Sequence, residues 1–299
     1  MIKQLLSLLI IPFILFRVAL NRVGRLWKRS SVIVDKYIYK TYYQDIGKEI
    51  TKVFPCNNYD DGSLAPIILR LAWHCCATYN KYTNTGGSNG STMRFLPELI
   101  VEGNTGLETA RLALEPIKQK YLITYSDLWT LAGKMAIESM NGPIISWKSG
   151  RIDCKYAKFP ISDHLPFGDK DSDHIRKTFT RLGFNDEETV CLLGAHSVGR
   201  CHKYISGWEG KWTKNPTKLS NEFYKNLLNE QWHESIVPET GKVQYYNEDN
   251  SLMMLPTDIE LIRDKNYLKF VKIYSSDDKK FYKDFSGAFS KLLRLGFNE

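Results

Sequence analysis

Three short segments, far apart along this 299-residue chain, place chemically reactive side chains inside runs that otherwise have the character of buried helices. They are Arg70-Leu-Ala-Trp73-His74, Gly194-Ala195-His196 and Thr257-Asp258. The first follows Pro66, a residue that the first turn of a helix accepts, and its neighbours are aliphatic. The chain is therefore expected to build helices that carry these polar side chains towards one another.

The first segment presents three different functional groups on one helical surface. Arg70, Trp73 and His74 stand at positions i, i+3 and i+4, so a helix aligns a cation, an indole and an imidazole. A neutral imidazole can take a proton from one oxygen of a peroxide and return it to the other, and a guanidinium can stabilise the charge that develops as the O–O bond breaks. The combination suits peroxide cleavage beside a haem iron.

The other two segments offer an iron ligand and its partner. A histidine that ligates iron through one nitrogen usually donates its other N–H to an oriented acceptor, which makes it a stronger ligand. Asp258 is the candidate acceptor for His196. The alternative interpretation of Asp258 is a helix N-cap. However, Thr257 and Glu260 already form a capping-box pattern, which is expected to leave the Asp258 side chain free.

These segments belong to a longer pattern, over roughly residues 45–295, that resembles the class I haem peroxidases and among them the cytochrome c peroxidases most closely. The five residues from Arg70 to His74 are the same as in that family. Further segments follow at the family's spacing: Asn84–Ser88, Arg94-Phe95, Asn104–Leu107, Ser206–Trp212 and Met253–Asp258. The joint pattern matters, because a single tryptophan or histidine in a helix is usually a core residue.

The resemblance implies roles for four residues on the peroxide side of the haem. His74 is expected to act as acid and base, and Arg70 to stabilise the leaving oxygen. Trp73 is expected to shape the pocket. Asn104 falls on the asparagine that orients this histidine in the family.

On the opposite side, the resemblance implies that His196 is the axial ligand to the iron of one haem b per chain. Asp258 would tune that iron through His196. Trp212 falls on the tryptophan that carries a radical in cytochrome c peroxidases and passes the oxidising equivalent towards the surface. A nearby anion favours such a cation radical, so Asp258 would serve both residues.

The implied activity is reduction of hydrogen peroxide to water with electrons from cytochrome c, which protects against reactive oxygen species. Alternatives are a peroxidase with a small-molecule donor and a non-enzymatic, haem-based peroxide sensor. The segment Gly199–Lys203 is similar to ascorbate peroxidases, but the ascorbate-binding arginine and lysine of that family fall on Ile205 and Gly62. The acidic cluster of cytochrome c peroxidases is reduced to Asp60 and Asp61, so steering of a basic cytochrome is expected to be weak.

The remaining periodicity predicts a mainly α fold with a few short strands. One helix is expected over Thr124–Met140, opened by a capping box between Thr124 and Asp127, and another begins at Asn185. A last amphipathic helix is expected to bury four side chains, Phe281, Phe285, Phe289 and Leu292. Short hairpin pieces are expected at residues 146–148 and 241–246, and Arg151 and Asp153 are expected to form a structural ion pair or turn.

The resemblance adds a domain organisation to this mainly α prediction. It implies a peroxidase domain over residues 31–299 with the haem between two helical lobes. The distal lobe would cover about residues 45–150 and the proximal lobe about 151–299. We expect this domain to be a monomer.

The basic charge of the chain is concentrated at its N-terminus. The formal net charge is +8, but residues 1–30 contain six cations and no acid, which leaves 35 basic against 33 acidic residues in the remainder. No basic, aromatic-interleaved stripe follows in the remainder. The composition therefore argues against a nucleic-acid-binding protein.

Residues 1–30 form a hydrophobic and basic leader. Thirteen uncharged residues separate Lys3 from Arg17, which is short of the roughly 20 that a membrane span needs, although a tilted anchor over residues 4–20 remains an alternative. An acid-poor, arginine-containing segment is also compatible with a mitochondrial presequence. The resemblance implies delivery to the mitochondrial intermembrane space; without a functional presequence the protein would be cytoplasmic.

Six cysteines without regular spacing predict free thiols, because the chain is long enough to build a core without disulfides. Cys75 and Cys76 directly follow His74. They would therefore lie near the peroxide site, where oxidation could reach them.

Overall fold

The computed structural model describes residues 41–156 and 165–297. A boundary after Ile46 separates the N-terminal residues from a unit, Gly47–Glu299, that contains every labelled element below. Residues 41–53 are helical. Within the described ranges, no helix is both long and apolar enough to cross a membrane. The predicted leader, residues 1–30, lies outside the described residues.

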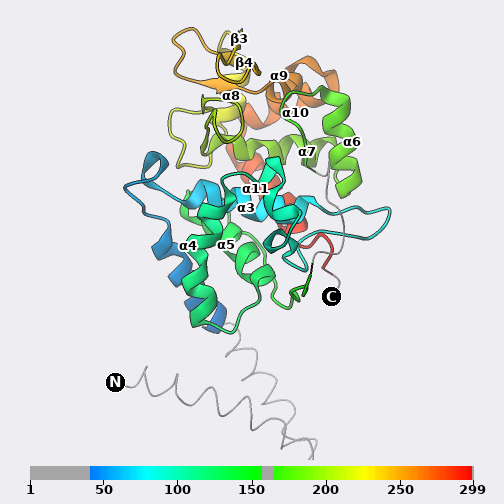
Figure 1. Cartoon of the computed structure of the whole chain (residues 1–299). Helices are drawn as coiled ribbons and strands as arrows, with labels where there is room; N and C mark the ends of the chain where they lie inside the picture. Colours follow the sequence, from blue (N-terminus) through cyan, green and yellow to red (C-terminus); the bar gives the residue numbers. More distant parts are fainter. Residues whose placement is uncertain (1–40, 157–164, 298–299) are drawn as a thin grey trace, which may run out of the picture. The chain divides into compact units, whose positions relative to one another are not determined.

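A first group of helices carries the Arg70–His74 segment. It consists of α3 (Ala65–Ala77), α4 (Leu107–Lys120) and α5 (Tyr125–Ser139), drawn in cyan and green in Figure 1. Short 3-10 helices accompany it: η1 (Asp60–Gly62), η2 (Thr92–Arg94), η3 (Glu98–Ile100) and η4 (Glu102–Asn104). Pro66 lies in the first turn of α3, as predicted. Helices α3 and α5 approach closely, because a Cβ placed on Gly133 would lie 2.3 Å from the Cβ of Ala72.

A second group of helices carries His196 and Asp258. It consists of α6 (Ser172–Leu182), α7 (Asp186–Leu193), α8 (Glu222–Asn229), α9 (Pro256–Arg263) and α10 (Lys265–Ser276). Helix α7 begins after the predicted cap, where the side chains of Asn185 and Glu188 each accept a hydrogen bond from the other residue's backbone N–H. It runs directly into the 3-10 helix η5 (Gly194–Ser197), which holds His196.

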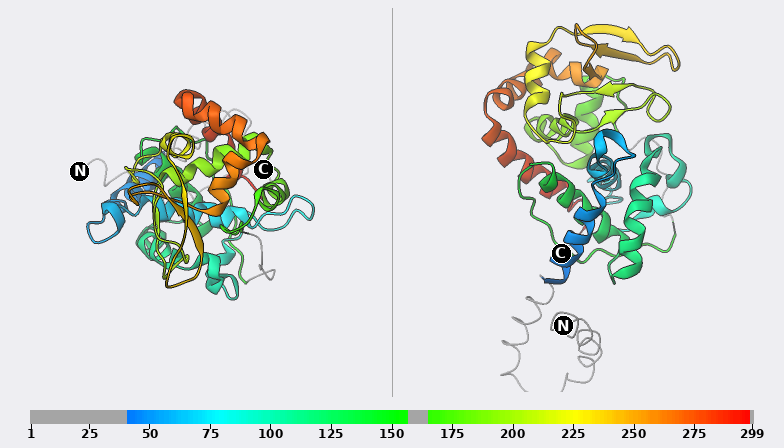
Figure 2. Two further views of the ribbon diagram at one scale, coloured as in Figure 1. Left: turned by 90° about the horizontal axis from the view of Figure 1, so that it is seen from above. Right: turned by 90° about the vertical axis from the view of Figure 1, so that its left-hand side faces the viewer.

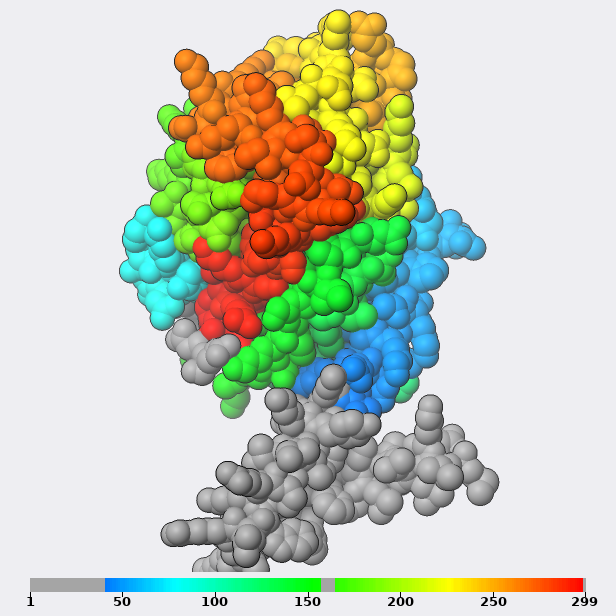
Figure 3. Space-filling view, turned by 180° about the vertical axis from the view of Figure 1, so that it is seen from behind, coloured from blue at the N-terminus to red at the C-terminus, as the bar shows by residue number. Residues whose placement is uncertain are grey.

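The last helix, α11 (Asp278–Leu292), closes the core between the two groups. Its four predicted apolar side chains are all buried: Phe281, Phe285, Phe289 and Leu292. The helix contacts both α7 and α3. It also lies against the segment that follows α5, where Ser290 Oγ accepts a hydrogen bond from the backbone N–H of Ser146; Figure 3 shows these red and green segments side by side.

Strands are short and few in the described part of the chain. The pair β1 (Arg200–Cys201) and β2 (Gly210–Lys211) is antiparallel, as is the sheet β3 (His233–Ile236), β4 (Val243–Tyr246) and β5 (Met253–Met254). The strand predicted at residues 241–246 is thus confirmed. The strand predicted at residues 146–148 is wrong, because no strand forms there and the backbone of Ser146 bonds a side chain of α11 instead.

Polar contacts around α5 correct two local predictions. Thr124 caps this helix by accepting from the backbone N–H of Asp127, as expected. The Asp127 carboxylate does not close a capping box, because it pairs with Arg151 at 2.8 Å in a fully buried contact. Asp153 is not the partner of Arg151 either; it accepts from the first backbone N–H groups of α5.

The mainly α prediction is confirmed by this arrangement. Figure 2 shows the two groups of helices from two further directions, with α11 leading from one group to the other. The Arg151–Asp127 pair crosses the expected lobe boundary at residues 150 and 151, and that boundary stays a prediction. The arrangement matters for function because a large cavity opens between the groups.

Candidate active site

The predicted site residues converge on one cavity of about 1030 Å³. Helix α3 lines one side of it, and the end of α7 with η5 lines the other. Arg70, Trp73 and His74 face it from the first side, and His196 and Trp212 from the second. Most of the remaining lining side chains are apolar. Segments that are distant in the sequence thus present their polar groups to a single apolar space.

The tautomer of His74 follows from its hydrogen-bond network. Asn104, at the end of η4, donates through its side-chain N–H to the carbonyl of Glu98 at 2.9 Å. The side-chain oxygen of Asn104 therefore points at His74 and accepts from Nδ1 at 2.9 Å. This assignment leaves Nε2 of His74 without a proton and available to the cavity. Asn104, the expected positioning residue, is thus hydrogen-bonded to His74.

The surroundings of His74 favour its neutral form. The side chain is buried, and burial is the main cause that lowers the pKa of His74 well below its usual value; the Arg70 guanidinium lowers it further. The Asn104 hydrogen bond raises the pKa but does not reverse the shift. A neutral imidazole at ordinary pH is the form that can accept a proton.

Arg70 is held by backbone carbonyls rather than by a carboxylate. Its Nη1 donates to the carbonyl of Thr105 at 3.0 Å, and its Nη2 donates to that of Gly103 at 2.6 Å. Burial lowers the pKa of Arg70 from its usual value. Since its hydrogen-bond partners among the described residues are these two carbonyls, the guanidinium keeps its charge available to the cavity that it lines. The sequence pattern did not signal the two carbonyls that orient it.

Trp73 forms part of the cavity wall on the same side. Its ring stacks on Phe179 of α6, with centroids 5.5 Å apart and planes at 18°. The contact joins α3 of the first group to α6 of the second. The role in pocket shape expected for Trp73 is compatible with this placement. Phe179 was not among the predicted site residues, since a phenylalanine at a helical position has no distinguishing signal.

His196 and Asp258 meet on the opposite side. The Nδ1 of His196 donates to Oδ1 of Asp258 at 2.8 Å, which leaves Nε2 as the lone-pair nitrogen. The His196 side chain is 30% exposed and lines the cavity, whereas the Asp258 side chain is 0% exposed. The pair thus has the arrangement of a metal-ligating histidine with a carboxylate behind it.

The buried carboxylate of Asp258 accepts three hydrogen bonds. Besides His196, its Oδ2 accepts from Nε1 of Trp212 at 2.7 Å and from the backbone N–H of Leu255 at 2.8 Å. The last contact corrects the expected Thr257–Glu260 capping box. Helix α9 begins at Pro256, so Asp258 itself caps the helix while its carboxylate also bonds the side chains of His196 and Trp212. One residue therefore performs both functions that the sequence presented as alternatives.

Trp212 stacks directly on His196. Their ring centroids are 4.4 Å apart and the planes meet at 18°, and Trp212 is only 6% exposed. The indole N–H is fixed by Asp258. A buried negative charge at hydrogen-bond distance from the indole lowers the cost of removing an electron from it.

The rim of the cavity pairs the two acids that precede α3. His202 Nε2 lies 3.0 Å from a carboxylate oxygen of Asp60, and Arg200 Nε donates to Asp61 at 2.9 Å. Arg200 and His202 were not among the predicted site residues. Both residues lie in the Gly199–Lys203 segment that the sequence pattern singled out. Their partners, Asp60 and Asp61, are distant in the sequence, so the pairing could not be predicted from residue spacing.

The cysteines are free thiols, as predicted, and all six lie within the described residues. Cys75 and Cys76 are buried, with their sulfurs 3.9 Å apart. A hydrogen bond to Cys76, together with burial, raises the pKa of Cys75 well above its usual value. Burial also raises the pKa of Cys201, which lines the cavity, to about 12. Both groups therefore remain protonated thiols with low reactivity.

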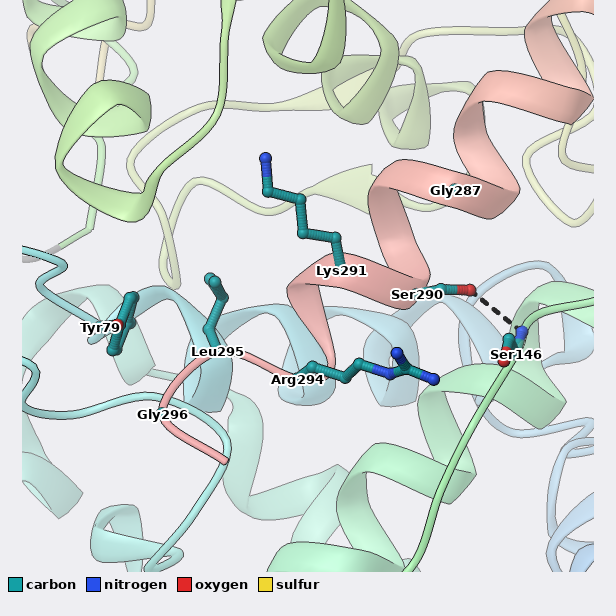
Figure 4. Close-up of a pocket in the computed structure, with 8 residues that line it drawn as sticks. All are labelled: Tyr79, Ser146, Gly287, Ser290, Lys291, Arg294, Leu295 and Gly296. Atoms are coloured by element: carbon teal, nitrogen blue, oxygen red, sulfur yellow. Dashed lines mark hydrogen bonds between the residues drawn. The ribbon is translucent and has the colours of Figure 1, made fainter. Parts of the chain in front are cut away.

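A second, smaller cavity of about 430 Å³ lies near the end of α11. Figure 4 shows its lining, with Ser290 bonded to the backbone of Ser146 and with Lys291 and Arg294 nearby. Lys291 is already paired with Glu188. None of the predicted site residues lines this cavity, and its groups do not form a catalytic arrangement.

Comparison with known proteins agrees with this geometry. A family model described as "Peroxidase" matches residues 46–277. A protein of Candida albicans named as a heme-binding peroxidase is 66% identical over 256 residues, which cover 85% of this chain and 88% of that protein. A protein of Debaryomyces hansenii with the same name is 63% identical over 269 residues, or 89% of this chain and 62% of its own length.

A third relative carries a more specific name. The mitochondrial cytochrome c peroxidase of Cryptococcus neoformans var. neoformans is 47% identical over 262 residues, which cover 87% of this chain and 69% of that protein. Both the family match and the identities extend over most of the described residues. The chain therefore belongs to the peroxidase family, as a class I haem peroxidase close to cytochrome c peroxidase.

Proposed function

We propose that this protein is a haem peroxidase that reduces hydrogen peroxide to water with electrons from a one-electron donor. The observation that carries the proposal is the pair of histidines on opposite sides of one cavity. His74 and His196 each have Nδ1 fixed by a hydrogen-bond partner, so each has a free Nε2. The relatives named as heme-binding and cytochrome c peroxidases support the same activity.

The residues around the cavity fit a haem. The space of about 1030 Å³ is mainly apolar, and His196 offers a single neutral nitrogen ligand backed by Asp258. Polar groups at the rim, including Arg200, His202 and Lys242, suit the carboxylates that a haem carries. When bound, the haem would supply the redox centre that reacts with peroxide and accepts electrons.

The residues on the α3 side would handle the protons and charge of peroxide. His74 would take a proton from one peroxide oxygen through Nε2 and deliver it to the other. Arg70 would stabilise the negative charge on the departing oxygen. Trp73 would limit the space above the reacting oxygens. Asn104 is a positioning residue, because it acts by holding His74 in one tautomer.

The residues on the opposite side would hold the iron and deliver electrons. His196 would hold the iron through Nε2, and Asp258 would be a positioning residue that keeps the ring orientation of His196 and increases its donor strength. Trp212 would carry one oxidising equivalent as a cation radical, stabilised by Asp258. Electrons from the donor would then return through Trp212.

Cytochrome c is the proposed donor, supported by the relative that is named for it. That relative is also named as mitochondrial, so we place this protein in the mitochondrion and propose the intermembrane space as its compartment. Residues 1–30, which would direct it there or attach it to a membrane, lie outside the described residues. The monomeric state and the absence of nucleic-acid binding stay predictions.

Two alternative functions, a peroxide sensor and a peroxidase with a small-molecule donor, can be compared with the structure. A sensor that signals through Cys75 and Cys76 is disfavoured, because both thiols are buried and the pKa of Cys75 is raised. Ascorbate as the donor is disfavoured, because Ile205 and Gly62 stand where ascorbate peroxidases have the cationic residues that bind it.

The direct test is peroxide turnover by the haem-loaded full chain, with reduced cytochrome c and ascorbate compared as donors. Peroxide-dependent oxidation of cytochrome c at many turnovers per haem is the expected result. Turnover with ascorbate alone would keep the peroxidase and replace the donor. A protein that binds haem but consumes no peroxide with either donor would contradict the proposal.

A further inference from the structure

A series of aromatic rings leads from the proposed haem side into the core between α8, α10 and α11. Phe223 lies edge-on to His196 at a centroid distance of 5.9 Å. Tyr224 follows at 5.3 Å from Phe223, and Tyr274 at 5.4 Å from Tyr224. Since Trp212 stacks on His196, the series begins at the residue proposed to hold an oxidising equivalent.

The first phenol in this series, Tyr224, lies close to the histidine-bearing turn. A Cβ placed on Gly194 would lie 2.3 Å from its hydroxyl oxygen, so glycine is required for the phenol to fit. The hydroxyl donates towards the carbonyls of Val190 and Cys191, at 2.9 and 3.1 Å. Peptide carbonyls are weak bases. Tyr224 is therefore satisfied structurally but has no group that could accept its proton outright.

The second phenol, Tyr274, has a different partner. Its hydroxyl donates to Oδ2 of Asp284 at 3.1 Å, although the residue itself is fully buried. Asp284 also accepts from Lys280, which orients the carboxylate, and a carboxylate is a much stronger base than a peptide carbonyl. A buried tyrosine in this protein does not need a hydrogen-bond acceptor. The hydroxyl of Tyr267, which is equally buried, has no hydrogen-bond partner among the described residues.

The difference between these phenols matters for one-electron oxidation. A phenol that loses an electron becomes a strong acid, so its oxidation is favoured when a base is hydrogen-bonded to it and can take the proton. Tyr274 has a carboxylate in this position, whereas Tyr224 has only carbonyls. An oxidising equivalent that enters the series is thus expected to settle on Tyr274.

We propose that Tyr224, Tyr274 and Asp284 form a relay that drains an oxidising equivalent from Trp212 when no external donor is present. This inference rests on the proposed peroxidase function, which supplies the oxidant through hydrogen peroxide. One electron passes from Tyr274 through Tyr224 to the Trp212 cation radical, and the phenolic proton of Tyr274 moves to Asp284. The products are neutral Trp212, a neutral Tyr274 phenoxyl radical and a protonated Asp284.

The relay would protect the ligand histidine and its surroundings. His196 stacks on Trp212, so a long-lived radical there would expose His196 to oxidation. Transfer to Tyr274 moves the radical across the Phe223 and Tyr224 rings to the side of the core formed by α10 and α11. At that position the side chain of Asp284 is 22% exposed, so the proton that it accepts can exchange with solvent.

The test uses the haem-loaded full chain containing ring-deuterated tyrosine, mixed with one equivalent of hydrogen peroxide without a donor and frozen rapidly. Electron paramagnetic resonance detects tyrosyl radicals, because deuteration narrows their signal. We expect a tyrosyl signal in the wild type, its loss in Tyr274→Phe and a strong reduction in Asp284→Asn. The matched control, Tyr267→Phe, removes the hydroxyl of another fully buried tyrosine and should leave the signal unchanged.

Peroxide consumption, measured in the same samples, distinguishes a failure of the tyrosine relay from a failure of the proposed peroxidase function. A tyrosyl signal that persists in Tyr274→Phe, or its absence from the wild type while peroxide is consumed, would overturn the relay and leave the peroxidase function standing. Equal loss in Tyr267→Phe would also overturn it. A wild type that consumes no peroxide would overturn both.

Discussion

At the scale of single residues, the site depends on a few hydrogen bonds that fix proton positions. Asn104 is oriented by the Glu98 carbonyl and in turn determines which nitrogen of His74 carries the proton. Asp258 does the same for His196. In both histidines the hydrogen bond at Nδ1 leaves Nε2 without a proton. The same kind of contact thus prepares His74 to accept a proton and His196 to bind the iron.

The pKa of His74 leads to a prediction about pH. Because burial and Arg70 lower the pKa of His74 well below its usual 6.5, the imidazole stays neutral at and above pH 6.5. The bimolecular rate constant for peroxide should therefore be flat from neutral pH down to about 6.5 and fall only in more acidic solution. Stopped-flow measurement against pH checks this. A decline centred at pH 6.5 or above would contradict the neutral, buried imidazole.

Trp212 gives a second prediction at this scale. Trp212→Phe keeps an aromatic ring against His196 but removes the indole N–H that bonds Asp258. The reaction with peroxide should remain within a factor of about ten of the wild type, while cytochrome c oxidation should drop by about a hundredfold or more, in line with losing a specific functional group. Transient and steady-state kinetics on one preparation give both rates. Equal loss of both would show that Trp212 supports the site rather than electron transfer.

The residue-level prediction from sequence succeeded where identity and spacing carry the information. The helical spacing from Arg70 to His74 correctly indicated a common face. It failed for the expected Thr257–Glu260 capping box, because the helix begins at Pro256 and Asp258 caps it while also bonding its expected partner, His196. The carbonyls that hold Arg70 were not predictable, since every residue has one.

At the scale of elements, helix boundaries follow from local signals and packing follows from apolar periodicity. Asn185 and Glu188 start α7 as expected, and the apolar stripe of α11 is buried as expected. The hairpin expected at residues 146–148 fails because its backbone partner comes from α11, far away in sequence. Local patterns thus predict elements well, but not the side chains that distant elements supply.

The apolar stripe of α11 provides a stability prediction. The Phe285 side chain is fully buried, with 0% of its surface in solvent, and it stacks on Phe289. Phe285→Ala should lower the free energy of unfolding by about 3–5 kcal/mol, because it removes a large buried side chain and leaves a cavity. Chemical denaturation of the apoprotein checks this. Lys283→Ala, on the exposed face of the same helix, should change it by less than about 0.5 kcal/mol.

At the scale of the whole molecule, charge bears on the choice of donor. Outside residues 1–30 the chain is close to neutral, and Asp60 and Asp61, the two acids before α3, are paired with His202 and Arg200. A basic cytochrome would therefore experience only weak long-range attraction. The fold group could be predicted from sequence, but this neutralisation could not, because the partners meet only in the folded structure.

The resulting prediction concerns ionic strength. Between low and physiological salt, the rate constant for cytochrome c oxidation should fall by clearly less than the roughly tenfold or larger effects of strongly steered pairs. Steady-state kinetics over a salt series checks this. A steep decline with salt would contradict the weak attraction expected for a chain that is close to neutral outside residues 1–30.

The central claim is that His74 cleaves peroxide on one side of the cavity while His196 holds the iron on the other. The most direct measurement is the rate of peroxide reaction with the haem-loaded His74→Leu variant. The variant should retain its haem, because His196 and Asp258 are intact, and react about 10²–10⁴-fold more slowly than the wild type. His233→Leu, at an exposed histidine outside the cavity, should react normally. Wild-type peroxide kinetics in His74→Leu would contradict the account.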